Sequence, residues 1–198
     1  MNRFRLSIAV AVLALGLIGA QAAFATTVQK LSLQDLAKKS DSIVMARVDD
    51  AVASWDAGHK EIYTLYTLQI SQGVKGRKGE STVQIRQIGG TVGNIASIVP
   101  GMPSFKKGEE VVVFLTQKDA NGYPWVMGLQ QGKYSIVEKN GAKVVRNDLA
   151  GTELLSNSGQ KTESVTAPDQ PLGAFLDGIK TTLNVDGKIQ VDPNPPTE

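Results

Sequence analysis

Most of the chain between residues 43 and 145 consists of short apolar segments, rich in β-branched and aromatic residues, separated by polar turns. This pattern is typical of β-strands that are joined by tight connections. Asn121-Gly122 and Asn140-Gly141 are the clearest hairpin signals, because both dipeptides favour two-residue turns. We predict strands over residues 43–48, 62–70, 83–88, 111–116, 125–129, 134–137 and 143–145.

Two segments with helical periodicity lie on either side of these strands. Ser32 is placed to cap a short helix over residues 33–39, with Asp35 three positions later. Pro171 stands at the first position of a second helix over residues 171–184, whose apolar residues recur on one face. Because no helix separates the strands, we expect a mainly β fold, a small antiparallel barrel with two flanking helices.

The first 25 residues have the pattern of a secretory signal peptide. Arg3 and Arg5 form a basic start, residues 6–18 are apolar, and Ala23 and Ala25 occupy the −3 and −1 positions of a cleavage site. The apolar stretch is shorter than the roughly 20 residues that a membrane-spanning helix needs. We therefore expect a secreted or periplasmic protein, cut after Ala25, with no membrane anchor after cleavage.

The chain beyond this leader divides into four predicted parts. Residues 26–149 form the barrel domain, and residues 150–170, rich in Ser, Gly, Thr and Gln, form a flexible connector. Residues 171–184 form the C-terminal helix, and the proline-rich residues 185–198 form a disordered tail.

Charge and composition exclude several classes of function. The chain has 21 basic and 19 acidic residues, and the excess comes from Arg3 and Arg5, so the mature net charge is zero. This balance does not favour a nucleic-acid partner. The absence of cysteine excludes thiol catalysis and cysteine metal sites. The single histidine, His59, lies in a predicted hairpin turn, so a serine triad is not expected.

The densest group of potential metal ligands lies in and around the same hairpin. Its spacing lacks the regularity of a calcium-binding loop, so we predict no metal and no cofactor. The group consists of Asp49, Asp50, Asp56, His59 and Glu61.

A long apolar connection over residues 89–108 is the strongest candidate for a binding surface. Connections of 20 residues are uncommon in small domains and are usually functional. One interpretation is an extra strand or a plug that closes one end of the barrel. The other is an exposed ridge for a protein partner. Its apolar side chains are Val92, Ile95, Ile98, Val99, Met102 and Phe105.

One part of the sequence resembles a known family. Residues 40–48, then 62–70, then Gln72-Gly73-Val74-Lys75-Gly76 are similar to the first two strands of the netrin-like domain in tissue inhibitors of metalloproteinases. This resemblance implies a barrel of the oligonucleotide/oligosaccharide-binding (OB) type and a secreted metalloprotease as partner. By analogy, the amine and carbonyl of Thr26 would take the place of the family's zinc-chelating cysteine. The disulfides that fix that end in the family have no counterpart here.

The chain is also similar to a group of uncharacterised exported bacterial proteins. That resemblance rests on residues 31–36, 86–90, 99–109 and 128–133, and extends over about residues 28 to 180.

Together these features predict an exported protein-binding module that is not an enzyme. One alternative is a binder of carbohydrate or cell-envelope polymer that uses Trp55, Tyr63 and Trp125, and another is a hydrolase with paired carboxylates in a pocket. The predicted partner-binding residues are Thr26, Thr27, Trp55, Asp56, His59, Val92, Ile95, Ile98, Met102 and Phe105.

Overall fold

The structure is a computed structural model that describes residues 27–147, 149, 153–155, 161–163 and 168–185. The predicted signal peptide, Thr26 and residues 186–198 lie outside the described residues. Within the described part of the chain, no helix has the length and apolar character needed to cross a membrane.

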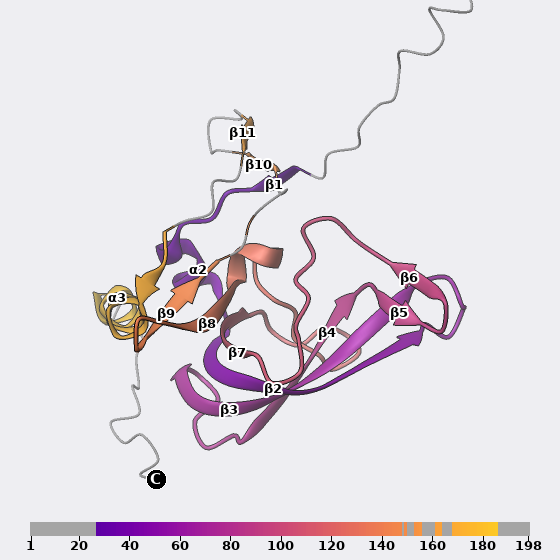
Figure 1. Ribbon diagram of the computed structural model, residues 1–198, viewed down its shortest axis with the longest axis horizontal. Helices are drawn as coiled ribbons and strands as arrows, with labels where there is room; N and C mark the ends of the chain where they lie inside the picture. Colours follow the sequence, from indigo (N-terminus) through magenta and orange to yellow (C-terminus); the bar gives the residue numbers. More distant parts are fainter. Residues whose placement is uncertain (1–26, 148, 150–152, 156–160, 164–167, 186–198) are drawn as a thin grey trace, which may run out of the picture.

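The described residues form a mainly β fold with a short helix near the start and a longer helix near the end, which confirms the predicted class (Figure 1). In chain order, the elements are β1 (Thr27–Gln29), α2 (Leu33–Lys39), β2 (Ser42–Trp55), β3 (Ile62–Lys75), β4 (Thr82–Ile88), β5 (Gly90–Val92), β6 (Ile95–Ser97), β7 (Glu110–Leu115), the 3₁₀ turn η1 (Leu129–Gly132), β8 (Lys133–Lys139), β9 (Ala142–Arg146), β10 (Glu153–Leu155), β11 (Lys161–Glu163), β12 (Gln170–Pro171) and α3 (Leu172–Val185).

The main sheet has seven antiparallel strands in the order β12-β9-β8-β7-β2-β3-β4. Its two outer strands, β12 and β4, are not hydrogen-bonded to each other, so the sheet is open rather than closed into a barrel. At the free side of β4, the backbone N–H of Arg86 donates to the carbonyl of Pro124 in the loop after β7.

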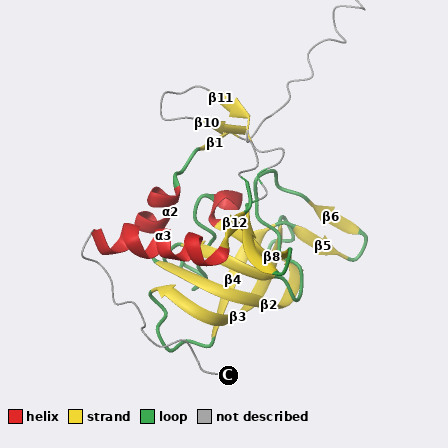
Figure 2. Ribbon diagram, turned by 60° about the vertical axis from the view of Figure 1, so that its left-hand side comes forward, coloured by secondary structure: helices red, strands yellow, loops and turns green. Residues whose placement is uncertain are grey.

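β7 is buried on both faces, and its side chains feed two separate hydrophobic cores. Val112 and Phe114 pack in the core under helices α2 and α3, whereas Val111, Val113 and Leu115 pack in the core on the opposite face. Successive side chains of a strand point to opposite faces, so a continuous apolar run is what a doubly covered strand requires. Figure 2 shows both helices lying against the same side of the sheet.

Helix α2 is fixed at both ends by polar contacts. At its start, the Asp35 backbone N–H donates to Ser32 Oγ while the Asp35 carboxylate accepts from the Ser32 N–H, which is a capping box. At its end, the Lys75 ammonium on β3 donates to the carbonyls of Ala37, Lys38 and Ser40. These carbonyls have no partner within the helix, so Lys75 satisfies them and ties α2 to the sheet.

The structure adds the short strands β1, β5, β6 and β12 to the predicted elements, so that Pro171 ends β12 and the last helix begins at Leu172. It differs from the prediction in two further places. Residues 125–129 contain only an isolated bridge between Val126 and Leu115, because Gly128 and Leu129 adopt positive φ values of 68° and 59° that end an extended strand. Within the predicted connector, β10 and β11 form a small sheet with β1, in which β10 runs parallel to β1.

Candidate binding site

Residues 90–97 form a hairpin, β5 and β6, that projects beside the far ends of β2 and β3 (Figure 1). We call this hairpin the arm. Its base is held by the chain at Gly89, whose N–H donates to the Ile62 carbonyl and whose carbonyl accepts from Thr64 Oγ1 at 2.6 Å. A Cβ at Gly90, where φ is +135°, would lie 2.3 Å from Thr64 Oγ1. Glycine is therefore required where the arm leaves the sheet.

The arm and the residue after it expose large apolar side chains. Ile95 is 54% exposed and Ile98 is 88% exposed, while Val92 is half-buried. These residues match the interpretation of the 89–108 connection as an exposed ridge. Contiguous exposed apolar patches, rather than single apolar side chains, mark protein contact surfaces.

Phe105 behaves in the opposite way and corrects its predicted role as a partner-binding residue. It is 6% exposed, and its ring lies 4.9 Å from the ring of Tyr66 in the core that the helices do not cover. Met102 is half-buried between these extremes. The connection thus divides: its first half forms the short strands β5 and β6 and projects, and its second half folds back onto the sheet.

An apolar groove lies between the arm and the returning segment. Its volume is about 350 Å³, and Ile98 and Val99 form part of its wall. The lining residues are Tyr66, Ile88, Gly89, Gly90, Thr91, Ala96, Ser97, Ile98, Val99, Met102, Pro103 and Ser104.

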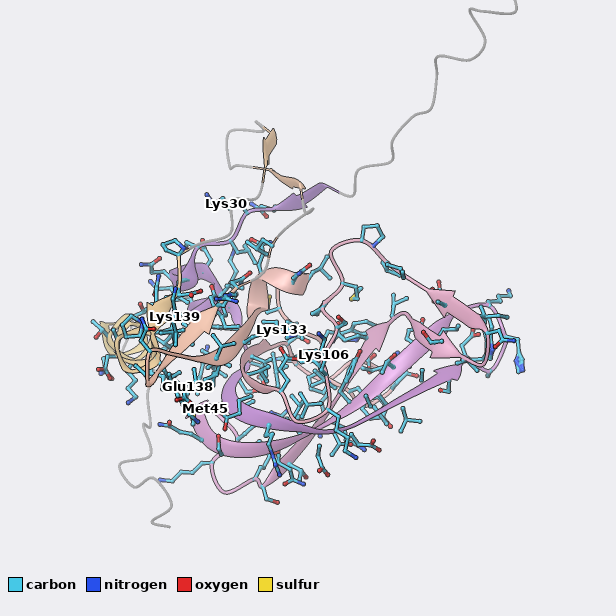
Figure 3. The ribbon with its side chains drawn as sticks, in the orientation of Figure 1. Lys30, Met45, Lys106, Lys133, Glu138 and Lys139 are labelled. Atoms are coloured by element: carbon cyan, nitrogen blue, oxygen red, sulfur yellow. The ribbon has the colours of Figure 1, made fainter. Side chains whose placement is uncertain are left out.

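A second, larger cavity of about 630 Å³ lies on the other side of residues 102–104, and we call it the basic pocket. It is formed by the segment 102–110 on one side and by β8 and β9 on the other. Lys106 and Lys133, which both line it, lie near each other in Figure 3. Its charged lining residues are Lys106, Lys107, Glu109, Glu110, Lys133 and Arg146.

Glu109 and Lys133 form a largely buried ion pair in the wall of the basic pocket. Their nearest atoms lie 2.8 Å apart, and the side chains are 18% and 14% exposed. Burial acts to raise the pKa of Glu109, but hydrogen bonds from Lys133, from Ser135 Oγ and from the Lys106 N–H outweigh it and lower that pKa. Lys133 also donates to the Ser104 carbonyl and lies over the Phe105 ring. The pair therefore fastens the returning segment to β8.

The basic pocket holds two acidic side chains, which is the arrangement that a hydrolase with paired carboxylates would need. Glu109 is held ionised by its partners, and Glu110 accepts from Lys143 at 2.7 Å. A glycosidase-type pair requires one carboxyl group whose pKa is raised so that it can act as a general acid. The lowered pKa of Glu109 does not suit that role.

The predicted hairpin residues lie near the arm, but their contacts are mainly within their own turn. Trp55 ends β2 and its ring lies 6.1 Å from that of His59, which is exposed. Asp56 accepts from the backbone N–H groups of Glu61 and Lys60, and these bonds lower its pKa. Asp56 therefore shapes the turn.

The N-terminal residues predicted to contact a partner, Thr26 and Thr27, are not shown to lie beside the arm. Thr27 lies in β1, which Figures 1 and 2 both place apart from the arm. Chelation by the Thr26 amine stays a prediction, because Thr26 lies outside the described residues.

Aromatic side chains cluster around Arg86 on β4. The sequence analysis named two of them, Tyr63 and Trp125, but did not predict the cluster. The guanidinium carbon lies 4.6 Å from the Tyr63 ring centre, 5.6 Å from that of Trp125 and 6.0 Å from that of Tyr123. Asp119 pairs with Arg86 at 3.0 Å and accepts from Trp125 Nε1. Tyr63 comes from β3, Tyr123 and Trp125 come from the loop after β7, and Arg86 comes from β4, so no local motif in the sequence indicates the cluster.

Other candidate chemistry has a structural explanation. Within residues 128–133, Leu129–Gly132 form the 3₁₀ turn η1, where the buried Gln131 side chain accepts from the Leu31 N–H and donates to the Gln29 carbonyl. Over the part of the chain that the structure describes, no group of three or more His, Cys, Asp or Glu side chains could hold a metal ion.

Comparisons with known proteins do not assign the chain to a family. No family model, no curated protein and no solved structure matches it. The netrin-like resemblance therefore stays a prediction.

Proposed function

We propose that this protein is an exported, non-catalytic protein-binding module, and that the arm and the apolar groove form its contact surface. The observation that carries the proposal is the position of Ile98, 88% exposed at the edge of a groove of about 350 Å³. Covering such a side chain and groove with a partner removes apolar surface from water, which favours association.

The way the segment is fastened supports this function. Gly89 fixes it at one end through hydrogen bonds with Thr64 and Ile62, and Phe105 fixes it at the other end in the core. A surface loop that is ordered before binding loses less conformational entropy when a partner arrives. Ile95 and Ile98 thus lie on a segment that is already ordered before a partner binds.

Site-specific photo-cross-linking tests the proposal. A photoreactive amino acid at position 98 should form a covalent adduct of defined mass in the cells that produce the protein. The matched control is position 52, because Val52 is 55% exposed on β2 and lies outside the arm and groove. An adduct at both positions, or at neither, would contradict a specific surface at Ile98. An adduct with a zinc protease would also support the family resemblance.

A second candidate function is carbohydrate binding, favoured by the cluster around Arg86. Tyr63 and Trp125 meet edge to face at 6.5 Å, and both remain partly exposed. Sugar rings stack on such aromatic faces through their C–H groups. Affinity electrophoresis in gels that contain soluble envelope polysaccharide tests this: slowed migration that Tyr63→Ala abolishes supports it, and unchanged migration of the unaltered protein contradicts it.

A further inference from the structure

We propose that the partner segment is an extended peptide that carries an acidic and an apolar side chain a few positions apart, with the acidic group in the basic pocket and the apolar group in the groove. This inference rests on the proposed function and adds the chemistry of the partner. Its basis is the placement of a cationic cavity and an apolar groove on the two sides of one short segment, Met102-Pro103-Ser104.

The charges in the basic pocket leave a positive excess on its rim. Glu109 is neutralised by Lys133, and Glu110 by Lys143. Arg146 is paired with Asp169 through two hydrogen bonds. Lys106 and Lys107 are exposed, line the cavity, and have no ion-pair partner among the residues that the structure describes. The pocket is therefore complementary to a carboxylate that the described residues do not supply.

Lys106 and Lys107 are held at the cavity rather than on a loose loop. The Lys106 N–H donates to Glu109 Oε2, and the Lys106 carbonyl accepts from the Glu109 N–H, which closes a tight turn. Glu109 is in turn fixed by Lys133 and Ser135 on β8. The ion pair between Glu109 and Lys133 thus holds the turn that carries Lys106 and Lys107.

The adjoining groove distinguishes a peptide from other anionic ligands. Residues 102–104 separate the two cavities, so a ligand that crosses this segment meets basic groups on one side and Ile98, Val99 and Tyr66 on the other. A polyphosphate or a sulfated sugar has no apolar side chain to place in the groove. A peptide carries both groups on one extended backbone, at about 3.3 Å per residue.

A selection from a randomised twelve-residue peptide library displayed on phage tests the inference. The purified protein should enrich peptides with Asp or Glu within a few positions of Leu, Ile or Phe. Binding of a synthetic copy of the enriched peptide should weaken about tenfold or more in the double variant Lys106→Glu, Lys107→Glu, because two attractive charges become repulsive. Raising the salt concentration should weaken binding to the unaltered protein and relieve the defect of the variant.

The control is the double variant Lys78→Glu, Lys118→Glu, which changes net charge equally at two exposed lysines outside both cavities and should bind the peptide normally. Peptides without acidic residues that still need Ile98 would overturn the inference and leave the proposed function standing. Equal binding of inorganic polyphosphate to the unaltered protein and to Ile98→Asp, with no peptide enriched, would overturn both. A peptide that binds the Lys106, Lys107 variant as well as the unaltered protein overturns the inference alone.

Discussion

Lys133 Nζ lies 2.8 Å from Glu109 Oε1 and links β8 to the segment that returns from the arm. We expect Glu109→Gln to lower the free energy of unfolding by about 1–2 kcal/mol at pH 7, because it leaves a largely buried ammonium group without its counter-charge. Urea denaturation measures the change. The matched control is Glu138→Gln on β8, an exposed carboxylate whose loss should change stability by less than about 0.5 kcal/mol.

The same pair predicts a pH dependence of stability. The folded pKa of Glu109 lies below its ordinary value of 4.5, so the unfolded chain binds more protons as the pH falls. The contribution of this carboxylate is complete well above pH 4.5 and is lost as the pH falls through the lowered pKa. The stability gap between the unaltered protein and Glu109→Gln should therefore narrow in acid. A gap that stays constant from pH 7 to pH 3 would contradict the assignment.

Phe105 and Ile98 lie seven positions apart, and we expect opposite effects from their truncation. Phe105→Ala should destabilise the fold by about 3 kcal/mol, because the ring is buried against Tyr66. Ile98→Ala should change stability by less than about 0.5 kcal/mol and should remove the position-98 contact with a partner. Thermal and urea unfolding of both variants measure the difference. Comparable destabilisation by the two changes would show that Ile98 is not a free surface residue.

Gly90 and Gly93 both have a positive φ, but only at Gly90 would an added Cβ clash with a neighbouring atom. A Cβ at Gly93 meets nothing within 4 Å, so Gly93→Ala should cost only about 1 kcal/mol for its φ of +58°. A Cβ at Gly90 would clash with Thr64 Oγ1, so Gly90→Ala should cost about 3 kcal/mol. It should also speed hydrogen exchange at the Gly89 amide, which donates to the Ile62 carbonyl. Equal effects of the two substitutions would contradict this account of the arm's base.

Asp119 predicts a local transition at low pH. Burial would raise its pKa, but hydrogen bonds from Trp125 Nε1 and from the backbone N–H groups of Tyr123 and Asn121 lower that pKa to about 2. The stability that the ionised Asp119 carboxylate gives through these hydrogen bonds is fully present above pH 3.8 and is lost as the pH falls through about 2. In a Trp55→Phe background, Trp125 emission should change near pH 2, and Asp119→Asn should show the altered emission already at pH 7. Emission that first changes near pH 4 would contradict the lowered pKa.

Local signals in the sequence predict the elements of this fold well. Ser32 and Asp35 announce the start of α2, and its capping box is formed as expected. The alternating pattern of residues 62–70 matches the buried and partly buried positions of β3. These predictions succeed because a cap or a strand face depends on residues a few positions apart.

Features that depend on distant partners were not predictable in the same way. β10 is a strand because it pairs with β1, more than a hundred positions earlier, and its own residues give no strand signal. Sequence alone also did not separate Phe105 from Ile98, since both are large and apolar. The basic pocket needs Lys133 from β8 beside Glu109, and the Arg86 cluster needs rings from β3 and from the loop after β7 beside β4.

A proline lies at each outer strand of the main sheet, within β12 and beside β4. Pro171 is one of the two residues of β12, and the Pro124 carbonyl accepts the N–H of Arg86 on β4. A proline lacks the backbone donor that a further strand would need, and β12 is too short to serve as a template. Edge-to-edge stacking of copies into fibrils is therefore disfavoured at both outer strands, which suits a protein whose Ile95 and Ile98 side chains are exposed to solvent.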